Sequence, residues 1–263
     1  ANVDSLVEEL AAAGQWANVR RLRELRDESV SHDWLWAINP AHGSAIPPGE
    51  FLTCVRLRVG AFMVDEPLPC ARCGALLDRA CSHALCCASA ESTKGHNRVR
   101  DGVLQLVHLA DPSAVVEHPA LIPSAPGLRP ADIYTWAALP GSQAALDVGI
   151  MSPDATGAGA DPCEAMQQKK LSFEDHLDEL RRLGIKYVPL AFSSYGRLHP
   201  DAAAALETIA RRAAQRRGLA SHQQLLRRAQ AAIGVIIWRR AAAMVHACLP
   251  RLSADELALF FWG

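Results

Sequence analysis

The hydrophobic residues between positions 96 and 217 change their spacing along the chain, and this change predicts a mixed fold. Apolar residues recur at helical spacing from 99 to 107, and three short apolar runs follow. The turn "PGSQ" separates two of these runs and predicts a hairpin of "DIYTWAAL" and "AALDVGI". Helical patterns at 163–183 and 201–217 then enclose the strand "IKYVPLAF". The order α, β, β, β, α, β, α predicts an α/β (α+β) fold with a small mixed sheet flanked by helices.

The pattern outside this region divides the rest of the chain into three segments. Residues 1–50 combine a helical pattern with a linker, and residues 51–95 hold a short helix and a cysteine-rich stretch. The helical pattern in residues 218–263 predicts a C-terminal helical extension. Its most apolar run, "AAIGVIIW", is soon followed by Arg239 and is too short to cross a bilayer, so we expect no membrane partner.

Charge is unevenly distributed, although the formal net charge is only −1. Residues 169–240 contain 14 basic and 6 acidic residues, whereas the remainder contains 13 and 22. This asymmetry favours a face that binds a polyanion, with an ordinary solvated helix surface as the alternative. The candidate phosphate-binding residues are Arg211, Arg212, Arg216, Arg217, Arg227 and Arg228.

Five of the eight cysteines lie between residues 70 and 87, in "CARCGALLDRACSHALCC". A Cys-x2-Cys turn followed by a His/Cys pair can supply a tetrahedral set of zinc ligands. Such clustering favours a metal site in a reducing compartment, nuclear or otherwise intracellular, over a disulfide framework. There are two alternatives to a metal site: the thiols are buried as small hydrophobic groups, or the Cys-x2-Cys cysteines form a redox pair. The expected structural zinc ligands are Cys70, Cys73, His83 and Cys87, with Cys86 as the alternative fourth ligand and Cys81 in reserve.

Two aspartates, Asp132 and Asp147, interrupt the two arms of the predicted hairpin. Carboxylates in this arrangement suit Mg²⁺ or Mn²⁺, which lowers the pKa of an attacking water in phosphodiester hydrolysis. The usual nuclease pattern places a lysine two residues after the second acid, where this chain has Gly149. Lys169 or Lys170, on the following helix, could reach the same water. In the alternative interpretation, Asp132 caps a turn, Asp147 pairs with an arginine, and the two lysines are solvated.

A third acid for this site could come from upstream in the chain. Asp101 lies in "GHNRVRD" at the start of a predicted helix, and Glu117 lies on the first predicted strand. His96 in the same stretch could assist the metal site or the zinc site, although a surface histidine is the simpler interpretation.

The order of these pieces resembles a known family. "SHDWLWAINP", "FLTCVRLRVG", "CARCGALLD", "SHALCC", "GHNRVRD", "RPADIY", "ALDVGI" and "KYVPLAFSSYG" together resemble the C-terminal region of reverse-transcriptase-like proteins of non-LTR retrotransposons. There, a cysteine–histidine knuckle precedes a restriction-like endonuclease domain of the PD-(D/E)xK type. The resemblance covers roughly residues 34–205. One departure is Cys81-Ser82, where Gly-Asp is more typical, and no polymerase motif occurs in these residues.

The resemblance implies roles for individual residues. Asp132 and Asp147 match the family's metal-binding acids, and Lys169 or Lys170 matches its lysine. Cys70, Cys73, His83 and Cys87 match its knuckle. The implied activity is Mg²⁺-dependent nicking of target DNA, with RNA as the alternative substrate and a polymerase domain upstream of this chain. The competing expectation is a non-catalytic nucleic-acid-binding or scaffold protein that keeps the fold and the zinc site.

Overall fold

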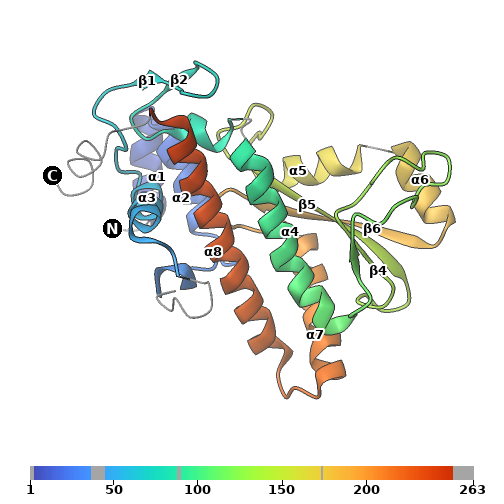
Figure 1. Ribbon diagram of the computed structural model, residues 1–263. Helices are drawn as coiled ribbons and strands as arrows, with labels where there is room; N and C mark the ends of the chain where they lie inside the picture. Colours follow the sequence, from blue (N-terminus) through green and yellow to red (C-terminus); the bar gives the residue numbers. More distant parts are fainter. Residues whose placement is uncertain (1–2, 37–44, 88–89, 173, 251–263) are drawn as a thin grey trace.

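The computed structural model describes residues 3–36, 45–87, 90–172 and 174–250 (Figure 1). Within this part of the chain there are eight α-helices. They are α1 (Val3–Ala12), α2 (Trp16–Leu25), α3 (Pro48–Val59), α4 (Ala90–Ala110), α5 (Pro162–Leu171), α6 (Glu174–Arg182), α7 (Pro200–Arg217) and α8 (His222–Cys248). The strands are β1 (Leu68–Pro69), β2 (Leu76–Leu77), β3 (Val115–Val116), β4 (Ile133–Thr135), β5 (Gln143–Met151) and β6 (Ile185–Ser193). The predicted mixed α/β fold is therefore confirmed.

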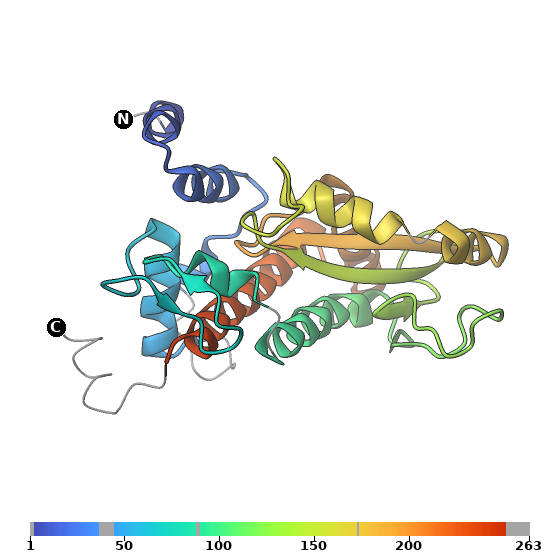
Figure 2. The same ribbon diagram turned by 90° about the horizontal axis from the view of Figure 1, so that it is seen from above.

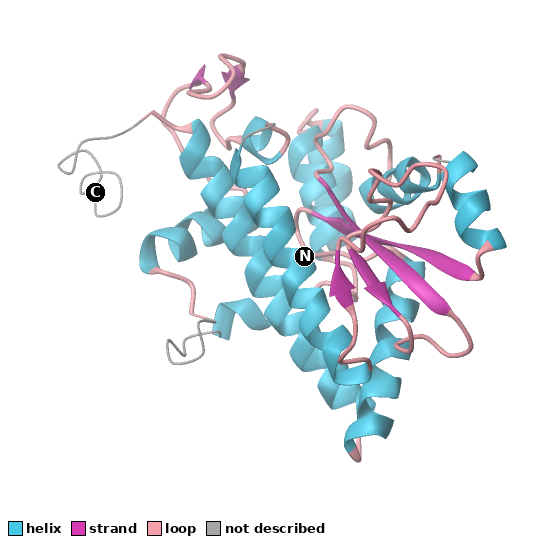
Figure 3. Ribbon diagram, turned by 45° about the vertical axis from the view of Figure 1, so that its right-hand side comes forward, coloured by secondary structure: helices cyan, strands magenta, loops and turns pink. Residues whose placement is uncertain are grey.

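The four-stranded sheet has the order β3-β4-β5-β6. Strands β3, β4 and β5 pair antiparallel, whereas β5 and β6 pair parallel over their full length, from Gln143↔Ile185 to Met151↔Ser193. A parallel pair needs a long connection, and here it contains α5 and α6. The sequence predicted one helix over 163–183, but the structure has two. Figure 3 shows the twisted sheet enclosed by helices.

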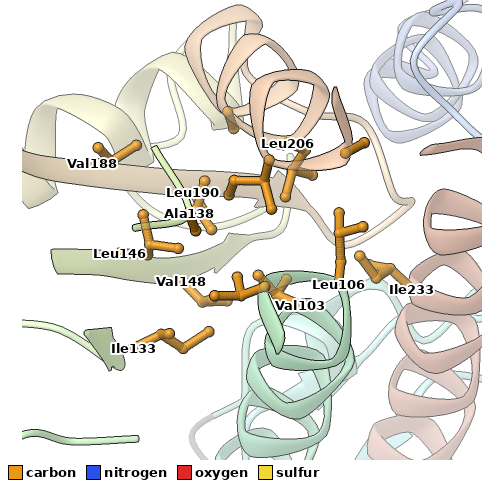
Figure 4. Close-up of a cluster of buried hydrophobic side chains, with 14 of the residues drawn as sticks. Val103, Leu106, Ile133, Ala138, Leu146, Val148, Val188, Leu190, Leu206 and Ile233 are labelled. Atoms are coloured by element: carbon orange, nitrogen blue, oxygen red, sulfur yellow. The ribbon is translucent and has the colours of Figure 1, made fainter. Parts of the chain in front are cut away.

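The two faces of β5 have different neighbours because strand side chains alternate. Leu146 and Val148 point into the main hydrophobic core, which α4, α7 and α8 complete (Figure 4). Asp147 and Gly149 therefore lie on the opposite face, which α5 covers (Figure 2). Since β5 is covered on both faces, its almost continuous apolar sequence is the one expected of a central strand.

A second hydrophobic cluster joins the cysteine-rich region to the rest of the protein. The indole rings of Trp34 and Trp238 stack with centroids 4.6 Å apart, and Cys54 and Leu85 belong to the same cluster. This cluster combines residues from all four predicted segments, because it also includes Tyr195 and because Trp238 belongs to α8. The domain boundaries remain predictions, and residues 251–263 of the expected C-terminal extension lie outside the described residues.

Helix α8 is the one helix of the described chain that is long and apolar enough to cross a membrane. In this structure 61% of its most apolar window is buried by other parts of the protein. It contacts α3, α4 and α7, so its hydrophobicity is accounted for by core packing.

Candidate functional site

The cysteine-rich region brings four potential metal ligands together. The ligand atoms of Cys70, Cys73, His83 and Cys87 all lie within 4.8 Å of one another. The Cys87 sulfur is 3.9 Å from that of Cys70 and 3.8 Å from that of Cys73. Tetrahedral zinc with Zn–S bonds of about 2.3 Å would hold two sulfurs about 3.8 Å apart. The group can therefore hold a metal such as zinc.

Backbone hydrogen bonds in this region favour the thiolate form of Cys70. The amide of Arg72 donates to the Cys70 sulfur at 3.4 Å. Although burial opposes ionisation, this amide and that of Cys73 lower the pKa of Cys70, and a thiolate is the form that binds metal. Four ligands leave no open coordination position, so such a site is structural.

The other cysteines of this region have different surroundings. Cys86 lies outside the four-ligand group, and burial raises its pKa although the hydroxyl of Ser152 opposes the rise. Cys81 is fully buried, and its pKa is raised to about 12 by burial. Cys248, at the end of α8, interacts with the sulfurs of Cys70 and Cys87. The sequence did not indicate Cys248 because more than 160 residues separate it from the cluster.

The two aspartates are neighbours across the hairpin. Ile133 faces Leu146 in the antiparallel register. The next position along this ladder therefore brings Asp132 opposite Asp147 on the adjacent strand. Hydrogen bonds fix the carboxylate of Asp132. One oxygen lies 3.0 Å from Nε2 of His96, and the other accepts from the amide of Val148 at 2.7 Å. His96, on α4, therefore contacts the candidate site instead of being a free surface histidine.

Helix α5 brings a lysine to Asp147. Asp161 caps the N-terminus of this helix: its carboxylate accepts hydrogen bonds from the amides of Cys163 and Glu164, and Pro162 lies in the first turn. Two turns later, the Nζ of Lys170 lies 2.7 Å from Oδ1 of Asp147. This ion pair is mostly buried, with side-chain exposures of 21% for the lysine and 12% for the aspartate.

The space for this lysine exists because residue 149 is glycine. A Cβ at Gly149 would lie 2.6 Å from the Cγ of Met166 and 3.2 Å from the Cε of Lys170. The Lys170 side chain thus crosses the strand at the position where the usual nuclease pattern has its own lysine. Gly149 is the signal in the sequence that could have pointed to a lysine on the helix, because a small residue there admits a side chain from the helix, although it does not distinguish Lys170 from Lys169.

Burial and mutual repulsion make this pair of acids dependent on positive charge. Burial raises the pKa of Asp147, and the nearby charge of Asp132 adds to the rise. Burial would also raise the pKa of Asp132, but hydrogen bonds with His96 and the Val148 amide outweigh it and lower this pKa. Lys170 favours the ionised form of both carboxylates. The site can therefore bind an added cation, or the ammonium group of Lys170 can itself balance the two carboxylates.

Tyr187 is a site residue that the sequence reasoning missed. Its hydroxyl donates to Oδ2 of Asp147, and burial and the charge of Asp147 raise its pKa. Tyr187 lies on β6, where it pairs with Ala145 of β5, so it is a diagonal neighbour of Asp147 two residues further along β5. Nothing in the sequence distinguished this tyrosine from other apolar-strand residues.

The remaining candidates lie elsewhere. The side chain of Lys169 is exposed. The carboxylates of Asp101 and Glu117 both bind Arg100, and that of Glu117 also binds Arg129. Among the described residues, no third carboxylate, imidazole or thiol joins Asp132 and Asp147 in a compact group of metal ligands.

The six candidate phosphate-binding arginines are all exposed. Four lie on the C-terminal half of α7 and two near the start of α8, on a hairpin that projects at the bottom of Figure 1. Arg211 pairs with Glu207 at 2.7 Å, and Arg216 donates to the carbonyl of Leu109 at 3.5 Å. No family model matches this chain, and no curated protein shows significant similarity to it.

Proposed function

We propose that this chain is a metal-dependent endonuclease of the restriction-like PD-(D/E)xK type. The observation that carries the proposal is the position of Lys170, whose ammonium group reaches Asp147 across the space above Gly149. In this proposal the two acids and the lysine take the roles of the acids and the lysine in the nuclease pattern, although the lysine comes from α5 instead of β5.

The chain's own residues have distinct tasks in this proposal. Asp132 and Asp147 would hold Mg²⁺ or Mn²⁺, which supplies an activated water and neutralises charge on the phosphate. His96 and Tyr187 hold the two carboxylates in place through their hydrogen bonds. Lys170 orients the attacking water and stabilises the negative charge that develops on the phosphate. Neither Glu117 nor Asp101 has a part in this proposal, because both pair with Arg100.

Two features of the cysteine-rich region support the resemblance from which the proposal started. The four knuckle residues lie together in the expected order. Cys81, which stands where the resembled proteins typically have glycine, has a φ of +56°. This left-handed conformation favours glycine. The substrate we propose is DNA, with RNA as the alternative, in a nuclear or other reducing compartment and with a polymerase domain upstream.

A second candidate function also has an observation in its favour. Each oxygen of Asp132 and of Asp147 already has a hydrogen-bonding partner within the protein. A network satisfied in this way can hold the fold without a metal. The second candidate is therefore a nucleic-acid-binding or scaffold protein that does not cleave.

Nicking of a supercoiled plasmid in Mg²⁺ or Mn²⁺ separates the two functions. We expect the wild type and Lys169→Ala to nick, and Lys170→Ala and Asp147→Asn to lose about 100-fold or more of the rate. The pair of adjacent lysines is the matched control, because both substitutions remove the same charge from the same helix. If the wild type does not nick with either ion, the scaffold function replaces the nuclease.

A further inference from the structure

A hollow of about 620 Å³ lies between the β4–β5 connection and α7. Its lining includes the side chains of Trp136, Gln143, Arg212 and Gln215 and the turn at 139–142. We propose that this hollow binds an unpaired nucleotide of a single-stranded nucleic acid, with the base stacked on Trp136 and the phosphate paired with Arg212. The inference takes nucleic acid as the ligand from the proposed function and adds a defined subsite for it.

Trp136 is exposed yet held in place. Its side chain packs edge-to-face against Tyr134, with ring centroids 4.7 Å apart, and the residue keeps 40% of its surface exposed. His118 packs against both rings. An aromatic side chain fixed on one side and open on the other can stack a base at little cost in conformational entropy.

A buried carboxylate fixes the backbone of this tryptophan. Asp111 follows α4 and is only 3% exposed. Its Oδ2 accepts from the amides of Trp136 and Ala137 at 2.8 and 3.0 Å and from the hydroxyl of Thr135 at 2.6 Å. Although burial opposes ionisation, these donors and Ser113 lower the pKa of Asp111 to about 2. The turn that presents Trp136 is therefore preorganised before any ligand binds.

The charge of the hollow suits a phosphate. Arg211 and Arg212 both line it, and Arg211 has a partner in Glu207. Arg212 is exposed and has no hydrogen-bond acceptor or acid among the described residues. One turn further along α7, Arg216 and Arg217 line a second hollow and continue the positive charge.

The polar groups beside Trp136 favour a base over an apolar partner. The hydroxyl of Tyr134 donates to Oε1 of Gln143, so the NH₂ group of Gln143 remains available to donate to a ligand. A volume of several hundred cubic ångströms suits a small ligand such as a nucleotide. Stacking on an indole needs a base with a free face, which a base-paired duplex does not offer. The hollow therefore favours single strands.

The position of the hollow relates it to the candidate nuclease site. Gln143 and Asp147 lie four residues apart on β5, which corresponds to about 13 Å along an extended strand. A nucleic-acid strand that reaches the acids could therefore also place a neighbouring, unpaired nucleotide on Trp136.

Fluorescence anisotropy with a labelled short oligothymidylate, using zinc-loaded protein in buffer without Mg²⁺ or Mn²⁺, tests the inference without any cleavage. We expect Trp136→Ala to weaken binding about tenfold, within the range of one base–aromatic stack, and Trp136→Phe to retain most of the affinity. Arg212→Ala should weaken binding and reduce its salt dependence. The controls are Trp16→Ala and Arg23→Ala, both on exposed positions of α2.

A blunt duplex of the same length provides the second arm of the experiment. Affinity for the duplex should change less than twofold in Trp136→Ala. The inference is overturned if Trp136→Ala binds oligothymidylate as tightly as Trp16→Ala does, or if it loses single-strand and duplex affinity equally. These measurements do not depend on nicking. A chain that binds single strands through Trp136 but never nicks would contradict the nuclease and support the subsite.

Discussion

Replacing Lys170 with methionine removes the cation that faces the buried carboxylate of Asp147. Methionine has similar length and flexibility, so the packing of α5 on β5 is largely preserved and the main loss is electrostatic. Removing one partner of a buried ion pair typically costs about 3–5 kcal/mol. The hydroxyl of Tyr187 still donates to Asp147, so we expect the lower end, about 3 kcal/mol. In a chain of this size that corresponds to a decrease of roughly 6–12 °C in Tm.

The loss should depend on pH. Without Lys170 the pKa of Asp147, already raised by burial, rises further above its ordinary value of 3.8. A carboxyl group with a raised pKa in the folded state disfavours folding once it ionises, so stability falls as pH rises through the folded-state pKa. The difference between Lys170→Met and the wild type should therefore be largest near neutral pH and shrink below about pH 4.

Urea denaturation followed by circular dichroism, in zinc-containing buffer without Mg²⁺, measures this effect. Lys169→Met is the control, because Lys169 is exposed and should change stability by no more than about 0.5 kcal/mol. Adding Asp147→Asn to Lys170→Met should recover most of the loss, since no buried charge is then left unpaired. Equal stability of the two lysine variants would refute the reasoning, as would a double variant no more stable than Lys170→Met.

Three further predictions concern other features of the structure. Gly149→Ala should destabilise the protein by about 1–3 kcal/mol through overpacking against Met166, and should also slow nicking. Cys73→Ser should remove bound zinc while Cys86→Ser retains about one ion per chain, as measured by metal analysis. Asp111→Asn should cost about 2 kcal/mol at pH 7; in the wild type this contribution is present above pH 3.8 and is lost as pH falls towards 2.

Each of these predictions has an outcome that would contradict it. Unchanged stability and nicking in Gly149→Ala would mean that Lys170 does not need the space above the strand. Zinc lost equally from both cysteine variants would place Cys86 in the site. A difference between Asp111→Asn and the wild type that persists at pH 2 would show that the aspartate acts through packing instead of charge.

Local sequence patterns predicted the mixed fold because each pattern reflects a local physical requirement. The change from helical to strand spacing near residue 114 and the "PGSQ" turn gave the hairpin that carries Asp132 and Asp147. The Cys70/Cys73/His83/Cys87 group was predictable for a similar reason, since four potential ligands of one ion within 18 residues have a short and specific spacing. The break between α5 and α6 was not predicted, because the helical pattern continues across it.

The choice between the two lysines was beyond local reasoning. Successive residues of a helix point about 100° apart, so Lys169 and Lys170 are equivalent until the face of α5 that packs on the sheet is known. The contributions of His96 and Tyr187 also depend on packing, since α4 and β6 reach the hairpin from distant parts of the chain. The same is true of Cys248, which α8 brings to the sulfurs of Cys70 and Cys87.

The sequence by itself determined the elements and the ligand types, because propensity, alternation and ligand spacing act over a few residues. It fixed the aspartates on adjacent strands, the glycine two residues after the second one, and the cysteine–histidine cluster. Only the tertiary structure decided that Lys170 occupies the space above Gly149 and that Arg212 and Trp136 line the same hollow. Such distances between elements follow from how whole helices pack on the sheet, and no local pattern encodes that packing.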